Sequence, residues 1–177
     1  MKVKNFSDAF PDVKIVEGIV FNDERGTLQK PFYGKNLKNL INPIKEVIFV
    51  NSKINVIRGM HFQKHPFEMS KLITCLKGKI IDVFIDLRKD SETFGEFESF
   101  ELSEENNYSL LIPNGFAHGY AVYSNEASVI YLQSNDYSHQ HECGINPLSF
   151  GFDWNIEKPI ISVKDQNLKD YINFFDL

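Results

Sequence analysis

The amino-acid sequence predicts an all-β protein built as a sandwich or a barrel. Eight or more short segments rich in β-branched and aromatic residues recur at intervals of about ten residues, with turn-forming residues between them. Aromatic residues make up 14% of the 177-residue chain, and sixteen Phe against one Trp suit a sheet protein with a large apolar interior. The clearest helical pattern lies in the tail, residues 162–175, so helices are expected at the periphery and the C-terminus.

The N-terminal part contains one predicted strand and one short helix. Residues 13–21, VKIVEGIVF, have the β-branched density of a strand. Residues 22–26, NDERG, close it with turn-forming side chains. Residues 35–45 are compatible with a short helix that Pro43 ends.

The central part is expected to contain three strands. Residues 46–51, EVIFVN, form the first, and residues 51–53 the turn after it. Residues 72–76 and 80–87 flank Lys77-Gly78-Lys79. Because glycine accepts backbone angles that a tight connection requires, this spacing predicts a β-hairpin.

Four further strands complete the expected barrel. They are separated by loop residues and by Pro113-Asn114-Gly115, which breaks the chain before a strongly apolar run. The predicted ranges are 96–102, 108–112, 116–123 and 128–132.

Length and charge narrow the class of protein. With 177 residues and no visible linker, residues 1–177 are expected to form a single domain. The net charge is 19 − 24 = −5 with no basic block, which excludes an extended nucleic-acid surface. Cys75 and Cys143 form no CxxC pair and no disulfide framework, which favours a reducing compartment. No signal peptide or membrane span is apparent, so we expect a cytoplasmic protein with no membrane partner.

His118 is the first candidate functional residue. In Pro113-x-Gly115-x-x-His118, an imidazole follows a tight turn at the start of a strand, which points the side chain into a barrel mouth. This spacing is similar to the second half of the cupin signature. The alternative is a histidine whose nitrogens are satisfied by backbone groups inside the barrel.

His61 is the second candidate, and its neighbours bear on metal binding. With Gln63 and Glu68, it resembles the first half of the cupin signature with Gln in place of the second His. A neutral amide oxygen is a poor ligand for a transition metal, so proton transfer is the favoured use of His61. A weakened metal site made of His61, Glu68 and His118 is the second interpretation.

Several blocks of residues carry a more specific resemblance. In chain order they are Arg58-Gly59-Met60-His61-Phe62-Gln63, Lys71-Leu72, Asp86-Leu87-Arg88-x-x-Ser91-x-Thr93-Phe94-Gly95, Ile112-Pro113-x-Gly115-Phe116-Ala117-His118-Gly119, His141-Glu142-x-Gly144-Ile145, Asp153-Trp154 and Ser162-x-Lys164-Asp165. Together they resemble the dTDP-4-dehydrorhamnose 3,5-epimerase family over most of the chain.

This resemblance implies a fold, a substrate class and an assembly. The fold is the cupin-type double-stranded β-helix, or jelly roll, and the assembly is a homodimer. The implied reaction inverts C3 and C5, or C3 alone, of a nucleotide-linked 4-keto-6-deoxy sugar, without a metal or an organic cofactor.

The resemblance also assigns four catalytic roles. His61 is the base that removes a proton next to the ketone, and Asp165 orients it by a hydrogen bond. Lys71 stabilises the developing enolate oxygen, and Tyr131 returns a proton. Asp165 has a second interpretation, since Ser162-x-x-Asp165 is similar to a capping box at the start of the tail helix.

Six further residues are expected to bind the substrate. Paired guanidinium groups suit phosphate oxygens, so Arg25 and Arg58 are matched to the diphosphate. Tyr137 and Lys164 are matched to further nucleotide contacts, and Gln63 and His118 complete the predicted set.

Some positions depart from the family pattern. Residues 132–137 read LQSNDY where the family commonly has KTTDYY, and residues 25–30 read RGTLQK where an aromatic residue and Glu are usual. Met69 stands where Gln is frequent. A 3-epimerase and an enzyme for another nucleotide or sugar therefore stay open. Two other classes do as well, a metal-dependent cupin oxygenase or isomerase and a non-catalytic sugar-nucleotide binding module.

Overall fold

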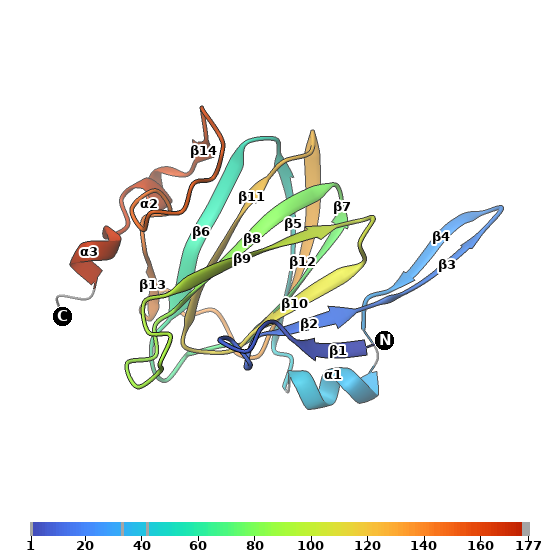
Figure 1. Ribbon diagram of the computed structural model, residues 1–177, viewed down its shortest axis with the longest axis horizontal. Coiled ribbons are helices and arrows are strands. Elements are labelled where there is room, and N and C mark those ends of the chain that lie inside the picture. Colours follow the sequence, from blue (N-terminus) through green and yellow to red (C-terminus); the bar gives the residue numbers. More distant parts are fainter. Residues whose placement is uncertain (1, 33, 42, 175–177) are drawn as a thin grey trace.

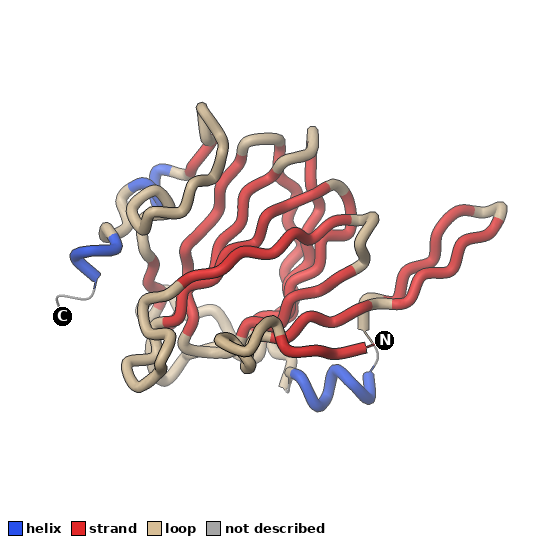
Figure 2. The backbone as a smooth tube through the Cα atoms, viewed as in Figure 1, coloured by secondary structure: helices blue, strands red, loops and turns tan. Residues whose placement is uncertain are grey.

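The computed structural model describes residues 2–32, 34–41 and 43–174 and consists mainly of two facing sheets (Figures 1 and 2). The first sheet has the order β1 (Lys2–Asn5), β2 (Lys14–Glu17), β10 (Tyr108–Ile112), β7 (Lys71–Lys77), β12 (Glu126–Gln133) and β5 (Glu46–Lys53). The second has the order β13 (Glu142–Gly144), β6 (Val56–Gln63), β11 (Phe116–Val122), β8 (Lys79–Asp86) and β9 (Phe97–Ser103), and β14 (Ile160–Ile161) pairs with β6. The predicted all-β jelly roll is confirmed.

The interior between the sheets is divided into an apolar end and a polar end. At the apolar end, Phe84 is surrounded edge-on by Phe6, Phe10 and Phe116, with ring centroids 5.0, 5.3 and 5.9 Å away. Such edge-to-face contacts add to the stabilisation from burying the rings. The polar end remains hollow, and the candidate site lies there.

Helices and the C-terminal segment cover the outer faces of the sheets. Helix α1 (Gly34–Leu40) packs Leu37 and Leu40 against the buried Leu72 and Leu132 of the first sheet. The segment that contains Phe150 and Trp154 packs against the second sheet. None of the described helices is long and apolar enough to cross a membrane.

The predicted first strand is interrupted. Residues 13–21 divide at Gly18 into β2, which joins the first sheet, and β3 (Ile19–Asp23), which pairs with β4 (Gly26–Lys30) in a separate hairpin. A Cβ at Gly18 would lie 3.0 Å from the carbonyl oxygen of Lys30. The predicted turn lies at the tip of this hairpin, which projects away from the body (Figure 1).

The hairpin prediction around Gly78 was wrong. Gly78 has the expected positive φ of 75°. However, β7 belongs to the first sheet and β8 to the second, so the chain crosses between sheets at this glycine. A local turn signal reports a change of direction and does not identify the strand's partner.

Three other boundaries differ from the predictions. The turn expected at residues 51–53 lies further on, because β5 continues to Lys53 while Ser52 pairs with Ala127. The helix expected at residues 35–45 ends at Leu40, and residue 42 lies outside the described residues. The expected tail helix is divided into α2 (Val163–Gln166) and α3 (Tyr171–Phe174), because Lys169 between them pairs with Ile145. Residue 175 also lies outside the described residues.

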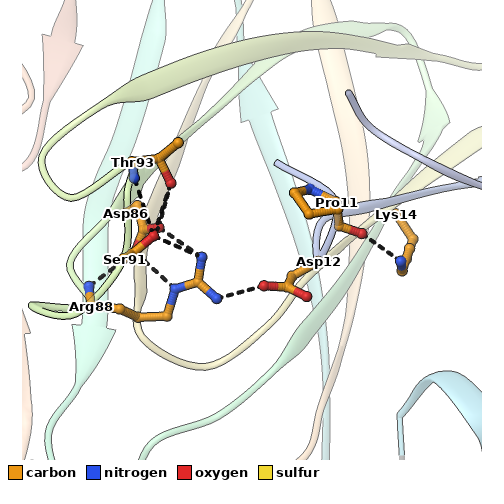
Figure 3. Close-up of polar contacts among 7 residues, drawn as sticks. All are labelled: Pro11, Asp12, Lys14, Asp86, Arg88, Ser91 and Thr93. Atoms are coloured by element: carbon orange, nitrogen blue, oxygen red, sulfur yellow. Dashed lines mark hydrogen bonds and ion pairs between the residues drawn. The ribbon is translucent and has the colours of Figure 1, made fainter. Parts of the chain in front are cut away.

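A polar network fixes the connection between β8 and β9 (Figure 3). The buried Asp86 carboxylate accepts hydrogen bonds from Ser91 Oγ at 2.6 Å, Thr93 Oγ1 at 2.7 Å and Arg88 Nη2 at 2.7 Å. Arg88 Nη1 also donates to Asp12 at 2.7 Å. This connection is therefore tied to the N-terminal segment by charge-assisted hydrogen bonds.

Candidate active site

A cavity of about 310 Å³ occupies the polar end of the barrel. This volume lies in the range of small-molecule sites. Seven of the ten predicted site residues line it: Arg58, His61, Lys71, His118, Tyr131, Lys164 and Asp165.

An irregularity in β6 places two of these side chains on the same wall. In a regular strand, residues three apart face opposite sides of the sheet. The pairing of β6 with β11 shifts register between His118 and Tyr120, opposite the segment from Arg58 to His61. Arg58 and His61 consequently both face the cavity.

His61 and Asp165 form a hydrogen-bonded dyad. His61 Nε2 lies 2.7 Å from Asp165 Oδ1, and Asp165 is only 4% exposed. Burial raises the pKa of Asp165, but the hydrogen bond and charge of His61, together with smaller contributions from Gly59 and Ser162, outweigh burial, so the net shift of the pKa is downward. An ionised Asp165 accepts a hydrogen bond from Nε2–H of His61, which leaves Nδ1 as the ring nitrogen that can take a proton.

Asp165 also belongs to a helix cap, so both interpretations of Ser162-x-x-Asp165 have a structural basis. The backbone N–H of Asp165 donates to Ser162 Oγ at 3.0 Å. The Asp165 side chain does not complete a capping box, because its oxygens accept hydrogen bonds from His61 and, at 3.4 Å, from the N–H of Gly59. The cap positions the backbone, and the carboxylate is directed at the imidazole.

Lys71 lies at the start of β7 and reaches across to the wall that carries His61. Its Nζ donates to the carbonyl oxygen of His61 at 3.0 Å. Burial lowers the pKa of Lys71 to about 8, partly offset by the charges of Asp82 and Glu142. Lys71 is therefore mainly a cation at neutral pH, with a proton that it releases more readily than an exposed lysine.

His118 is buried and paired with a carboxylate. Its Nε2 lies 2.7 Å from Asp82 Oδ2, with His118 at 3% and Asp82 at 0% exposure. Burial lowers the pKa of His118 and raises that of Asp82, since each charged form loses its hydration. The histidine is thus satisfied by a side chain, and not by backbone groups alone as the alternative interpretation proposed.

Tyr131 faces the dyad from the other sheet. It lies on β12, and its ring meets His118 edge-on with centroids 5.8 Å apart. Burial raises the pKa of Tyr131 well above its usual value, and Tyr120 and Asp82 raise it further. The Tyr131 phenol is therefore protonated throughout the physiological pH range.

A second recess of about 210 Å³ adjoins the cavity at His61 and Lys71, and Gln63 and Tyr137 line it. Tyr137 Oη and Lys164 Nζ donate to the two oxygens of Glu142 at 2.6 and 2.5 Å. Gln63 uses its amide for the backbone of the neighbouring loops, donating to Phe67 O at 2.7 Å and accepting from Ser138 N at 2.6 Å. Gln63 therefore organises the recess.

Two predicted ligands lie elsewhere. Arg25 is at the tip of the β3–β4 hairpin, 88% exposed along its side chain and paired with Asp23, so the structure does not bring it to the cavity of its own chain. Glu68 interacts with His65 at 3.2 Å. The described residues include no group of three or more His, Cys, Asp or Glu that could hold a metal ion.

Sequence reasoning missed Asp82, Tyr120, Ser52 and Glu142. Asp82 carried a usable signal, because a carboxylate in the otherwise apolar run IIDVFI is buried at a cost that needs a partner. Ser52 and Tyr120 meet across 68 positions, so no local pattern connects them. Glu142 carried no distinct signal either, although its partner Tyr137 is only five residues away.

Comparison with known proteins agrees with this arrangement. A family model described as dTDP-4-dehydrorhamnose 3,5-epimerase matches residues 7–172. The dTDP-4-dehydrorhamnose 3,5-epimerase of Shigella flexneri is 39% identical over 168 residues, covering 92% of this chain and 93% of that protein.

Solved structures are similar as well. The dTDP-4-dehydrorhamnose 3,5-epimerase of Bacillus anthracis, with TDP and PPi bound, has a TM-score of 0.88 and 34% identity over 96% of this chain and 99% of that one. The Legionella pneumophila dTDP-6-deoxy-D-glucose-3,5-epimerase in complex with dTDP-4-keto-L-rhamnose has a TM-score of 0.89 and 32% identity, with coverages of 97% and 93%. The family match spans nearly the whole chain, and the chain belongs to the dTDP-4-dehydrorhamnose 3,5-epimerase family.

Proposed function

We propose that this protein epimerises a nucleotide-linked 4-keto-6-deoxy sugar, such as dTDP-4-dehydro-6-deoxyglucose, at C3 and C5 or at C3 alone. The observation that supports this most directly is the placement of a base and an acid on facing walls of one cavity. His61 lies on β6 of one sheet and Tyr131 on β12 of the other. Inversion of a carbon needs a proton removed from one face and returned on the other.

The reaction follows from these groups. The C4 ketone acidifies the neighbouring C–H bonds, so neutral Nδ1 of His61 can take a proton while the bond's electrons move onto the C4 oxygen. Lys71 is placed to stabilise the resulting enolate. The Tyr131 phenol then gives its proton to the opposite face of the carbon. Base, acid and cation all come from the chain, so the proposal requires no metal ion or organic cofactor.

The proposed nucleotide is dTDP, and its binding is assigned to the cavity's cationic rim. The similar structures hold TDP or a dTDP sugar, and Arg58 and Lys164 line the cavity here. A guanidinium and an ammonium group at one mouth suit a diphosphate. Tyr137 lies in the adjoining recess, where a nucleoside can contact it.

The test is isotope exchange. In D₂O with dTDP-4-dehydro-6-deoxyglucose, we expect deuterium at C3 of the sugar, and at C5 as well if both centres are inverted, followed by proton NMR. Binding without exchange for dTDP-, GDP-, CDP- and UDP-linked 4-keto sugars would reject the proposal in favour of a binding module. Stoichiometric metal in active protein would favour the metal-dependent class instead.

We also propose that the protein is a cytoplasmic homodimer. The outermost strand β5 carries Val47 and Phe49, each 58% exposed, and the β3–β4 hairpin carries Phe21 and Leu28, each 53% exposed. Apolar side chains on a sheet edge suit a surface that a second copy covers. In such a dimer, Arg25 of one copy is proposed to contact the diphosphate bound in the cavity of the other copy. Light scattering should give twice the monomer mass, and a single-chain mass would contradict the proposal.

The proposed cytoplasmic location is supported by the cysteines. Both cysteines are free thiols, which suits a reducing compartment.

A further inference from the structure

Glu46 carries a buried oxygen whose capacity to accept a hydrogen bond is unused. It is the first residue of β5 and lines the recess of about 210 Å³ together with Gln63, Gln133 and Tyr137. Within the described part of the chain, the buried Oε2 atom of Glu46 has no hydrogen-bond partner. Taking a carboxylate oxygen out of water without a donor costs free energy, so such an atom needs an explanation. A donor supplied by a bound ligand provides one.

The other carboxylate of the recess is already hydrogen-bonded. The two oxygens of Glu142 accept from Tyr137 Oη at 2.6 Å and from Lys164 Nζ at 2.5 Å. The pKa of Tyr137 is raised mainly by its hydrogen bond to Glu142, and the charge of Glu46 adds to this shift. Glu46 is therefore an unused acceptor close to the ring that the proposed nucleoside contacts.

Gln133 places an amide beside this carboxylate. On β12, it pairs directly with Glu46 of β5 and, on its other side, with Lys71 of β7. Residues directly opposite each other in antiparallel strands have side chains on the same face, with Cβ atoms about 5 Å apart. Gln133 is only 7% exposed and lines both the cavity and the recess. The recess thus presents an acceptor next to an amide that can donate or accept.

We infer that Glu46 accepts a hydrogen bond from the ring N3–H of a thymine or uracil base, and that Gln133 donates to the carbonyl oxygen at C4 beside it. An acceptor next to a donor is the complement of the donor and acceptor on that edge of the base. Cytosine has a lone pair at N3 and an amino group at C4. Its N3 lone pair would therefore face the Glu46 carboxylate, which disfavours binding.

The size of the recess favours a one-ring base. Its volume of about 210 Å³ lies below the range of drug-sized sites. A pyrimidine therefore suits it better than a purine, although guanine also carries ring N–H donors. This inference rests on the proposed function, which places the nucleoside at Tyr137, and it adds the residues that select the base.

Equilibrium binding of dUDP and dCDP tests the inference without catalysis, because the two bases differ only at ring positions 3 and 4. By isothermal titration calorimetry, we expect the wild-type protein to bind dUDP roughly 10- to 100-fold more tightly than dCDP, the value of one hydrogen bond to a charged group. Glu46→Gln keeps the size of the side chain and should bring this ratio close to one, since its amide can turn either its oxygen to N3–H or its NH₂ to the N3 lone pair. Glu46→Met removes both acceptors and should also abolish the preference.

Two further variants separate selection from affinity. Gln133→Met should weaken dUDP and dCDP binding by similar factors, because the amide it removes can turn to serve either base, and should leave their ratio unchanged. Glu126→Met is the matched control. It removes a carboxylate from the same sheet at the opposite end of β12, where Glu126 is paired with Lys77, and should change neither affinity.

The outcomes separate the inference from the function on which it rests. A wild-type ratio near one, a ratio unchanged in Glu46→Gln, or tighter binding of GDP than of dUDP would each overturn the base assignment and leave the epimerase proposal standing. A ratio lowered as far by Glu126→Met would overturn it too. A base preference that depends on Glu46, in a protein that shows no isotope exchange, would reject the epimerase and keep Glu46 as the residue that selects the base.

Discussion

Replacing His61 with Asn should lower both epimerisation and deuterium uptake at C3 and C5 about 10³-fold, because general bases contribute roughly 10²- to 10⁴-fold. Deuterium exchange and inversion both begin with proton removal by Nδ1 of His61. The variant should still bind dTDP, since Arg58 and Lys164 are unchanged. The expected combination is strongly slowed deuterium exchange, followed by NMR, with an unaltered affinity for dTDP.

The partner of His61 provides the control for this prediction. Asp165→Asn can donate to Nε2 through its amide and so place the imidazole proton on Nδ1, which blocks the base. It should cost nearly as much as His61→Asn, and the double variant should cost no more, because the two residues act as a unit. Ser162→Ala removes the cap at about 1 kcal/mol but keeps the carboxylate. If Ser162→Ala lost as much activity as Asp165→Asn, capping and not orientation would explain Asp165.

Replacing Lys71 with Met should lower the rate about 10²- to 10³-fold, which is typical for removing one stabiliser of an oxyanion. The same residue predicts a pH dependence. The pKa of Lys71 is lowered to about 8 by burial, so the cation is present below that pH and is lost above it. The value of kcat/KM, which reports the free enzyme, should therefore fall as the pH rises through about 8.

Lys71→Arg distinguishes charge from general damage at this position. The guanidinium keeps its charge well beyond pH 10, so the alkaline fall should move upward even if the maximal rate is lower. An unchanged alkaline fall in Lys71→Arg would assign it to another group.

The sequence predicted the sheet fold well because alternation and turn chemistry are local. Residues 96–102 and 108–112 correspond closely to β9 and β10. The hairpin around Gly78 failed since pairing is decided by the facing surfaces and not by the turn. The contact between His61 and Asp165 spans 104 positions, and no local pattern contains it. Only the ordered blocks of the family resemblance connected the two.

The sequence predicted which residues line the candidate cavity better than it predicted the contacts among them. His61, Lys71 and Tyr131 line one cavity as the resemblance implied. The contact between Ser52 and Tyr120 was not predictable, because both are ordinary strand residues until the two sheets are brought face to face. Arg25 is the opposite case: the resemblance matched it to the diphosphate, and only the fold reveals that it lies on a projecting hairpin.

The C-terminal segment that carries Asp165 is held to the sheets by few backbone pairings. Asp165 comes from a C-terminal segment whose backbone pairs with β6 through the two residues of β14. After Asp165 the backbone forms one bridge, from Lys169 to Ile145, and Asp170 and Tyr171 add hydrogen bonds to Asn146 and Ser149. Regions with so few backbone pairings open before the core does. On gradual heating, catalytic competence should therefore disappear while the barrel is still intact, and cooling should restore it.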